Sequence, residues 1–199
     1  MFERKIIPLA VAAVVLLGTA GAVFARDEND DQQEAAAVQS ATISLAQAVD
    51  AAQKHTGGYA IAAGMEKTKG GYRYEVRTVA KQHVTQNVID SSTGAVITTE
   101  HEGAIARLFD REHRAELGKL QSAKTTLSSA IAAVEQHSGG KAFEAAFENE
   151  NAKTGFEVDV TKDGGTQKFL VDAATGNIET LAASDHDEQR GQHDEEHED

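Results

Sequence analysis

The amino-acid sequence predicts an α+β fold made of two tandem small units. Each unit is expected to be one amphipathic helix packed on a three- to four-stranded antiparallel sheet, and a linker helix joins the two. The stretch IDSSTGAVI (residues 89–97) returns 82 residues later as VDAATGNIE (residues 171–179), and at that offset residues 45–97 align with a second segment without a gap. Both copies pass from helical to strand periodicity in the same order. A repeat of this kind indicates two copies of one structural unit.

Each copy is predicted to begin with a helix. Apolar residues recur at i, i+3, i+4 and i+7, which makes one apolar stripe: Leu45, Ala48, Val49 and Ala52, then Leu127, Ala130, Ile131 and Val134. Ser44 and Thr126 stand at the N-cap position, and Gln47 completes a capping-box pattern in the first copy. Gly57 and Gly139 follow the helices and favour a left-handed C-cap.

A histidine ends both helices, in HTGG (residues 55–58) and HSGG (residues 137–140). An imidazole near the last carbonyls of a helix suits the helix dipole. We therefore interpret His55 and His137 as structural residues rather than as ligands or catalytic groups.

The second half of each copy has strand periodicity. YRYEVRTV (residues 72–79) and GFEVDV (residues 155–160) alternate apolar with polar residues, which predicts a sheet with one solvated face and one face on the helix stripe. The repeated phrase then supplies a tight turn. Asp90 and Asp172 can accept hydrogen bonds from amides two or three residues on, and Gly94 and Gly176 can adopt positive φ. These four residues are predicted to serve the turn rather than acid catalysis.

The segments outside the repeats differ in composition. Residues 1–25 have a basic start at Arg4 and Lys5, an apolar run, and small residues before Arg26, the layout of a secretory signal peptide. An uncleaved membrane anchor is the alternative, and in either case the body is expected to be extracytoplasmic, periplasmic or secreted. Residues 26–41 are expected to be a flexible acidic lead-in, 101–123 a charged linker helix, and 184–199 a disordered acidic tail.

Charge and composition exclude several classes of function. The net charge is −13 and the chain has no cysteine. An acidic surface repels phosphate backbones, so no nucleic-acid partner is expected. Without cysteine there is no thiol catalysis and no thiolate metal site. The sequence also lacks a nucleophile-elbow motif and an ordered ligand triad, which argues against a hydrolase.

The ordered signature of helix, His-x-Gly-Gly, aromatic-Glu-Val and [IV]D-x-x-TG-x-[IV] resembles the PepSY domain, twice, over residues 42–100 and 124–183. The resemblance implies a helix on an antiparallel sheet and a binding role. PepSY modules occur in the propeptides of thermolysin-like metallopeptidases, where they restrain the protease. The scaffold residues carry over, namely Tyr74-Glu75-Val76, Phe156-Glu157-Val158 and the turn residues, and the family offers no catalytic residues. No peptidase domain follows the repeats in this sequence, so we expect a peptidase partner to be met in trans.

The C-terminal segment offers an alternative function. His186, His193 and His197 lie among carboxylates that together could bind Zn²⁺, Cu²⁺ or Ni²⁺ weakly. Residues 193–197, HDEEH, also match a metallopeptidase pattern, but that chemistry needs a helix in a closed cleft. The first prediction for function, which rests on the resemblance, is a non-enzymatic extracytoplasmic binding module that inhibits or regulates peptidases. No cofactor is expected. The alternative is an envelope metal-binding or metal-sensing protein.

Overall fold

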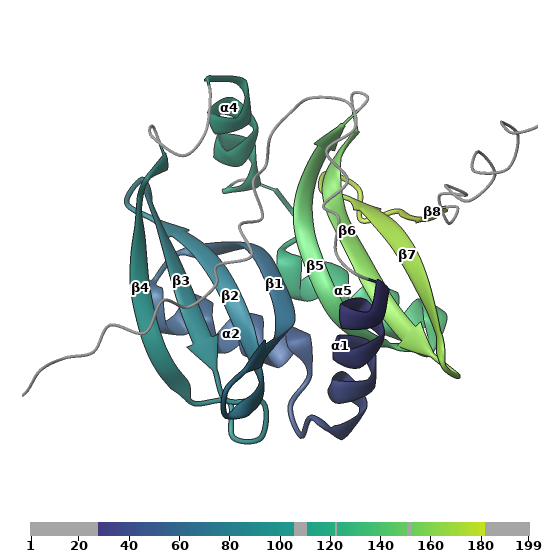
Figure 1. Cartoon of the computed structure of the whole chain (residues 1–199). Coiled ribbons are helices and arrows are strands. Elements are labelled where there is room, and N and C mark those ends of the chain that lie inside the picture. The colour runs from purple at the N-terminus through teal and green to yellow at the C-terminus, as the bar shows by residue number, and fades with distance from the viewer. Residues whose placement is uncertain (1–27, 106–110, 122, 151–152, 182–199) are drawn as a thin grey trace, which may run out of the picture.

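A computed structural model describes residues 28–105, 111–121, 123–150 and 153–181. The predicted signal peptide and the C-terminal tail lie outside these ranges. The described residues form one eight-stranded antiparallel sheet in the order β4-β3-β2-β1-β5-β6-β7-β8, with helices packed against it (Figure 1). The predicted α+β class with two tandem units is confirmed, and the two units share this single sheet.

The two units have the same order of elements. The first contains α2 (Leu45–Thr56), β1 (Tyr59–Thr68), β2 (Gly71–Ala80), β3 (His83–Ile89) and β4 (Val96–Ala104). The second contains α5 (Leu127–Ser138), β5 (Lys141–Glu150), β6 (Lys153–Lys162), β7 (Gly165–Asp172) and β8 (Ile178–Leu181). Helix α1 (Glu28–Ser40) precedes the first unit, and α4 (Arg111–Leu120) precedes the second.

Local sequence explains where α2 and α5 begin and end. In α2 the Ser44 hydroxyl accepts from the Gln47 amide at 3.2 Å, while the Gln47 side chain accepts from the Ser44 amide at 2.8 Å. Thr126 and Ser129 make the same reciprocal pair before α5. Each helix stops where Gly57 or Gly139 takes a positive φ, 67° and 69°. The first and last turns are thus satisfied by residues that the repeat supplies twice.

One face of the sheet is covered by α2 and α5, and the core lies between. The apolar stripes of both helices are buried together with Met65, Val76, Phe147 and Val158 in one continuous cluster. Because α2 and α5 also pack against each other, the two small units share a core that is larger than either could form alone.

The units join through a short ladder between β1 and β5. Its register pairs Ala62 with Ala146, Ala63 with Ala145, and Gly64 with Glu144. Ala63 and Ala145 differ by 82 residues, so they are equivalent positions of the repeat. A pair formed by two equivalent residues of antiparallel strands places a pseudo-two-fold axis at that pair.

The repeat extends further towards the N-terminus than the sequence indicated. Residues 26–41 were expected to be a flexible lead-in, but Glu28–Ser40 form α1. Shifting α1 by 82 residues gives residues 110–122, which overlay α4. The buried Ala35 and Val38 then correspond to the buried Leu117 and Leu120. The lead-in and the linker are therefore the same element of the repeat. Its first copy was missed because its apolar residues are few and small.

Both of these helices connect the two units. In α1 the Gln33 side chain accepts from Lys67 of β1 at 2.8 Å, and the Gln39 carbonyl accepts from Lys141 of β5 at 3.2 Å. In α4 the Leu117 carbonyl accepts from Tyr59 of β1 at 3.2 Å. The predicted linker, residues 101–123, begins inside β4 and is helical over Arg111–Leu120. Among the described helices, none is both long and apolar enough to cross a membrane.

Removing the ring of Phe147 is expected to lower the free energy of unfolding by about 3–5 kcal/mol. Phe147 is 1% exposed and meets the Phe156 ring edge-on, with centroids 6.3 Å apart. The matched control is Ile97→Ala, at a site 50% exposed, which is expected to change stability by less than about 0.5 kcal/mol. Urea unfolding of both variants measures the difference, and equal losses would contradict this description of the core.

Candidate functional site at the junction of the two units

The repeated turn residues lie at opposite edges of the sheet. Asp90 closes the β3–β4 hairpin, where its Oδ1 accepts from the amides of Ser92 and Thr93 at 3.0 and 2.9 Å. Asp172 closes the β7–β8 hairpin in the same way, through Ala174 and Thr175 at 3.1 and 2.7 Å.

Hydrogen bonds to Thr93 and to Thr175 lower the pKa of Asp90 and of Asp172 below the ordinary aspartate value. Gly94 and Gly176 take φ of 74° and 75°. The structure does not bring these aspartates into a shared site.

The histidines do not form a site within the described part of the chain. His55 and His137 are exposed, and His137 lies edge-on to Phe169 with ring centroids 5.9 Å apart. His186, His193 and His197 lie outside the described residues. Within residues 28–105, 111–121, 123–150 and 153–181, no group of three or more His, Asp or Glu side chains is placed to hold a metal ion.

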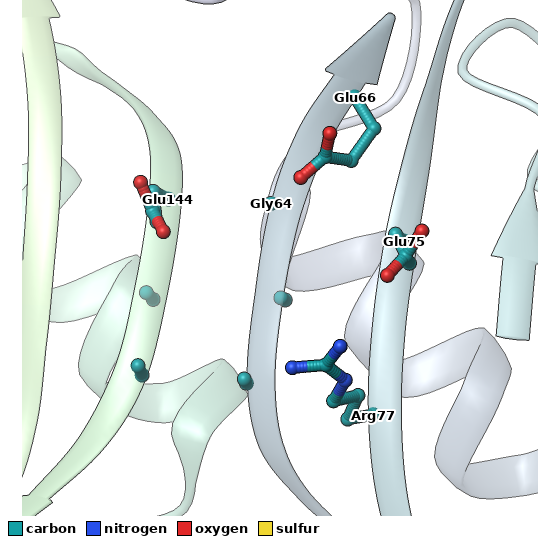
Figure 2. Close-up of a pocket in the computed structure, with 9 residues that line it drawn as sticks. Gly64, Glu66, Glu75, Arg77 and Glu144 are labelled. Atoms are coloured by element: carbon teal, nitrogen blue, oxygen red, sulfur yellow. The ribbon is translucent and has the colours of Figure 1, made fainter. Parts of the chain in front are cut away.

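The face of the sheet opposite α2 and α5 is polar where the two units meet. The strand register puts two rows of side chains across the junction on this face: Arg77, Ala62, Ala146 and Glu157 in one, and Glu75, Gly64, Glu144 and Asp159 in the other. Figure 2 shows the labelled side chains of this region in front of the strands, with the helices behind. Glu75 and Glu157, the glutamates of the repeated aromatic-Glu-Val strand, are therefore brought to one surface.

A shallow hollow lies between these rows, and we call it the seam hollow. It holds about 30 Å³, space for one or two waters. The residues that line it come from β1, β2 and β5: Ala62, Ala63, Gly64, Glu66, Glu75, Arg77, Glu144, Ala145 and Ala146. Small residues form the floor, and the longer side chains are three carboxylates and one guanidinium. The hollow is too small for a metabolite, but its floor lets a partner approach the backbone of the sheet.

Burial and charge set the electrostatics of the first unit's side of the hollow. Arg77 Nε donates to Glu102 Oε1 at 3.0 Å, and Arg77 is buried. Burial raises the pKa of Glu75 above its ordinary value, while the neighbouring Gln86 amide and Arg77 oppose this rise and Glu102 adds to it. The carboxylate of Glu75 is thus held by its neighbours in a partly desolvated position.

The second unit reaches a similar balance with different residues. The repeat places Asp159 at the position of Arg77 and Lys168 at the position of Gln86. Lys168 Nζ lies 2.5 Å from Glu157 Oε1 and 3.6 Å from Asp159 Oδ2. The sequence pattern predicts that Glu75 and Glu157 lie on strands, but it does not place them on one surface, because the pairing of β1 with β5 leaves no local signal.

Comparison with known proteins identifies the repeated unit. A family model described as the peptidase propeptide and YPEB domain, PepSY, matches residues 42–100 and 124–180. No curated protein matches the chain. Among solved structures, a candidate lipoprotein of Clostridium difficile 630 is 17% identical, with a TM-score of 0.41, and the match covers 71% of this chain and 95% of that one.

Two substitutions beside the hollow are expected to move the pKa of Glu75 in opposite directions. Arg77→Gln removes a positive charge that lowers this pKa, so the pKa should rise. Glu102→Gln removes a negative charge that raises it, so the pKa should fall. Carboxyl NMR titration of the two variants against the wild type measures both shifts. Movement in the same direction would refute the assignment of charges around Glu75.

Proposed function

Because the chain belongs to the PepSY family, we propose that it is a non-enzymatic extracytoplasmic binding module that inhibits or regulates a secreted or envelope peptidase in trans. The observation that carries this proposal is the continuous sheet. Its open face, which is the face opposite α2 and α5, presents the seam hollow with residues from both units. Family membership supports an extracytoplasmic, non-catalytic module, because PepSY domains accompany peptidases as propeptides.

The geometry of the hollow suggests how a partner is bound. Ala62, Gly64 and Ala146 leave the backbone accessible at the centre of the sheet, while Glu75 and Glu144 stand on either side of Gly64 in one cross-strand row. A partner segment with basic side chains fits this arrangement, because charges of opposite sign favour encounter and fix orientation. Since the lining comes from both units, we propose one binding surface for the pair of repeats.

Filling the hollow is expected to weaken the partner's binding while leaving the fold intact. Gly64 has an ordinary φ, and a Cβ added there would meet its nearest atom, the Phe143 carbonyl oxygen, at 3.8 Å. Gly64→Leu should therefore fold and should weaken binding by about tenfold or more, the loss expected for an interface core position. The matched control is Gly118→Leu, at an exposed position with open space around a Cβ.

The measurement uses the mature chain and thermolysin-like peptidases of the same secreted or envelope fraction. Binding is followed by affinity capture, and regulation is followed by the rate of substrate cleavage with and without the chain. Failure of every such peptidase to bind or change activity would refute the proposed function. Equal binding by the Gly64→Leu and Gly118→Leu variants would instead refute the seam hollow as the surface.

A second proposal concerns the tail and is supported by the sequence pattern alone. If His186, His193 and His197 bind Zn²⁺, Cu²⁺ or Ni²⁺, the full-length chain should take up more metal than a chain ending at Ala183. Calorimetric titration of each metal into both chains measures this difference. Equal uptake would remove the tail as a metal site.

A further inference from the structure

The open face of the second unit gathers three carboxyl groups around one ammonium group. Glu144 of β5 lies directly across from Asp159 of β6, and Asp159 lies directly across from Lys168 of β7. Glu157 is two residues before Asp159 on the same strand and so faces the same side. Lys168 donates to Glu157 at 2.5 Å and lies 3.6 Å from Asp159 Oδ2. We call these four residues the acid-lysine cluster.

We propose that Asp159 holds an exchangeable proton within the acid-lysine cluster, so that the charge of the open face beside the seam hollow changes with external pH. The presence of this proton does not depend on the proposed function. Its effect on the binding of a partner rests on that function.

The geometry explains why one carboxyl group of the cluster keeps a proton. The ammonium group of Lys168 is shared between two carboxyl groups of β6, and its closest contact is with Glu157 rather than Asp159. The Oδ1 atom of Asp159 is inaccessible to solvent and has no hydrogen-bond partner among the described residues. A buried carboxylate oxygen without a donor favours the protonated form, which carries no charge to desolvate.

Electrostatic effects act in the same direction. Burial raises the pKa of Asp159 to about 7, Lys168 opposes the rise, and Glu157 and Glu144 add to it. Burial disfavours the charge of Lys168, but attraction to Asp159 and the hydrogen bond to Glu157 outweigh this effect and raise its pKa. Lys168 therefore stays charged while Asp159 titrates.

Other charged groups near β6 do not replace this arrangement. Helix α1 also packs against β6 and carries the buried Glu34, a further acid. Helix α5 packs against the face of β6 opposite the acid-lysine cluster. It carries Glu135, which accepts from the Ala142 amide at 2.9 Å. In the first unit the position of Asp159 is occupied by Arg77, which is permanently charged. The first unit therefore has no acid at the position equivalent to Asp159.

The sign of the pH dependence follows from the raised pKa. Between about pH 4, the ordinary aspartate value, and about pH 7, the folded chain binds a proton at Asp159 that the unfolded chain has lost. The stability contributed by this proton is present in full below that window and falls as pH rises through it. Above pH 7 the folded face carries one more negative charge, which strengthens attraction for a basic partner.

The first test needs no partner. Urea unfolding of the full chain from pH 4.5 to 8 compares the wild type with Asp159→Asn and with Asp50→Asn, an exposed control on α2. Relative to Asp159→Asn, the wild type should lose up to tenfold in its folding equilibrium constant per pH unit between about pH 5 and 7. The control should follow the wild type. Parallel curves for the wild type and Asp159→Asn would overturn the proposal.

A direct titration covers the case in which Asp159→Asn does not fold. Carboxyl carbon NMR of the wild-type chain should show one aspartate with a midpoint near neutrality. If every aspartate in the described residues titrates below about pH 5, the proposal is overturned.

The effect on binding is tested with a hexalysine peptide as the probe. Wild-type affinity for the peptide should increase between pH 5.5 and 8, and Asp159→Asn should lack that increase. The same pH dependence in both proteins would overturn the coupling between proton and surface. A peptide that binds neither protein would count against the basic partner of the proposed function, whereas the unfolding and NMR results would still decide the proton.

Discussion

The two half-sheets are joined into one sheet by a backbone ladder of three residue pairs. Ala62, Ala63 and Gly64 of β1 meet Glu144, Ala145 and Ala146 of β5. Two half-sheets can hydrogen-bond only if the edges of β1 and β5 are left open for each other, so each unit presents its first strand at its edge. On the helix side, Ala63 and Ala145 are buried under α2 and α5. Their small side chains let the two helices pack against each other above the junction.

The polar layer on the other face follows from this junction. Joining the sheets brings Glu75 and Glu144 into one row and Glu157 into the next. In the first unit Arg73 and Arg77 of β2 lie on this face among the acids, and in the second unit Lys168 of β7 does. The exchange of positions between the units is compensatory, since an acid at the site of Arg77 accompanies a lysine at the site of Gln86. In the second unit Lys168 is shared between Glu157 and Asp159, and the Oδ1 atom of Asp159 has no hydrogen-bond partner among the described residues.

Local sequence determined most of what could be predicted. The apolar stripes, the caps at Ser44 and Gly57, and the turn at Asp90 and Gly94 each depend on residues within about four positions of one another. Patterns of this range identify helices, strands and hairpins. The pairing of β1 with β5 depends instead on residues 82 positions apart, and the alternation of a strand does not name its neighbour. The seam hollow is a consequence of that pairing. The acid-lysine cluster depends on the register of β5, β6 and β7, which the alternation of each strand does not fix either.

Helix α1 was missed for a different physical reason. Its buried side chains, Ala35 and Val38, contribute little apolar area compared with Leu117 and Leu120 of the equivalent α4. Part of its attachment is polar, through Gln33 and the Gln39 carbonyl to lysines of both units. A helix that is stabilised by lysine side chains of neighbouring strands needs no strong apolar periodicity in its own sequence. Only an extension of the 82-residue alignment towards the N-terminus, beyond Leu45, would have indicated this helix.

The architecture also bears on where a partner can bind. An open sheet has two edges, and the β4 edge is long and exposed, with Ile97 half exposed. Register shifts interrupt its pairing with β3 at both ends, and Glu100 and Glu102 add charge along it. Bulges and charges of this kind are the means by which sheets discourage addition of a further strand. The seam hollow lies instead on the face of the sheet, away from both edges, and its lining comes from β1 and β2 of the first unit and β5 of the second. A surface that the two units form only together is therefore the better place for a partner that needs both repeats.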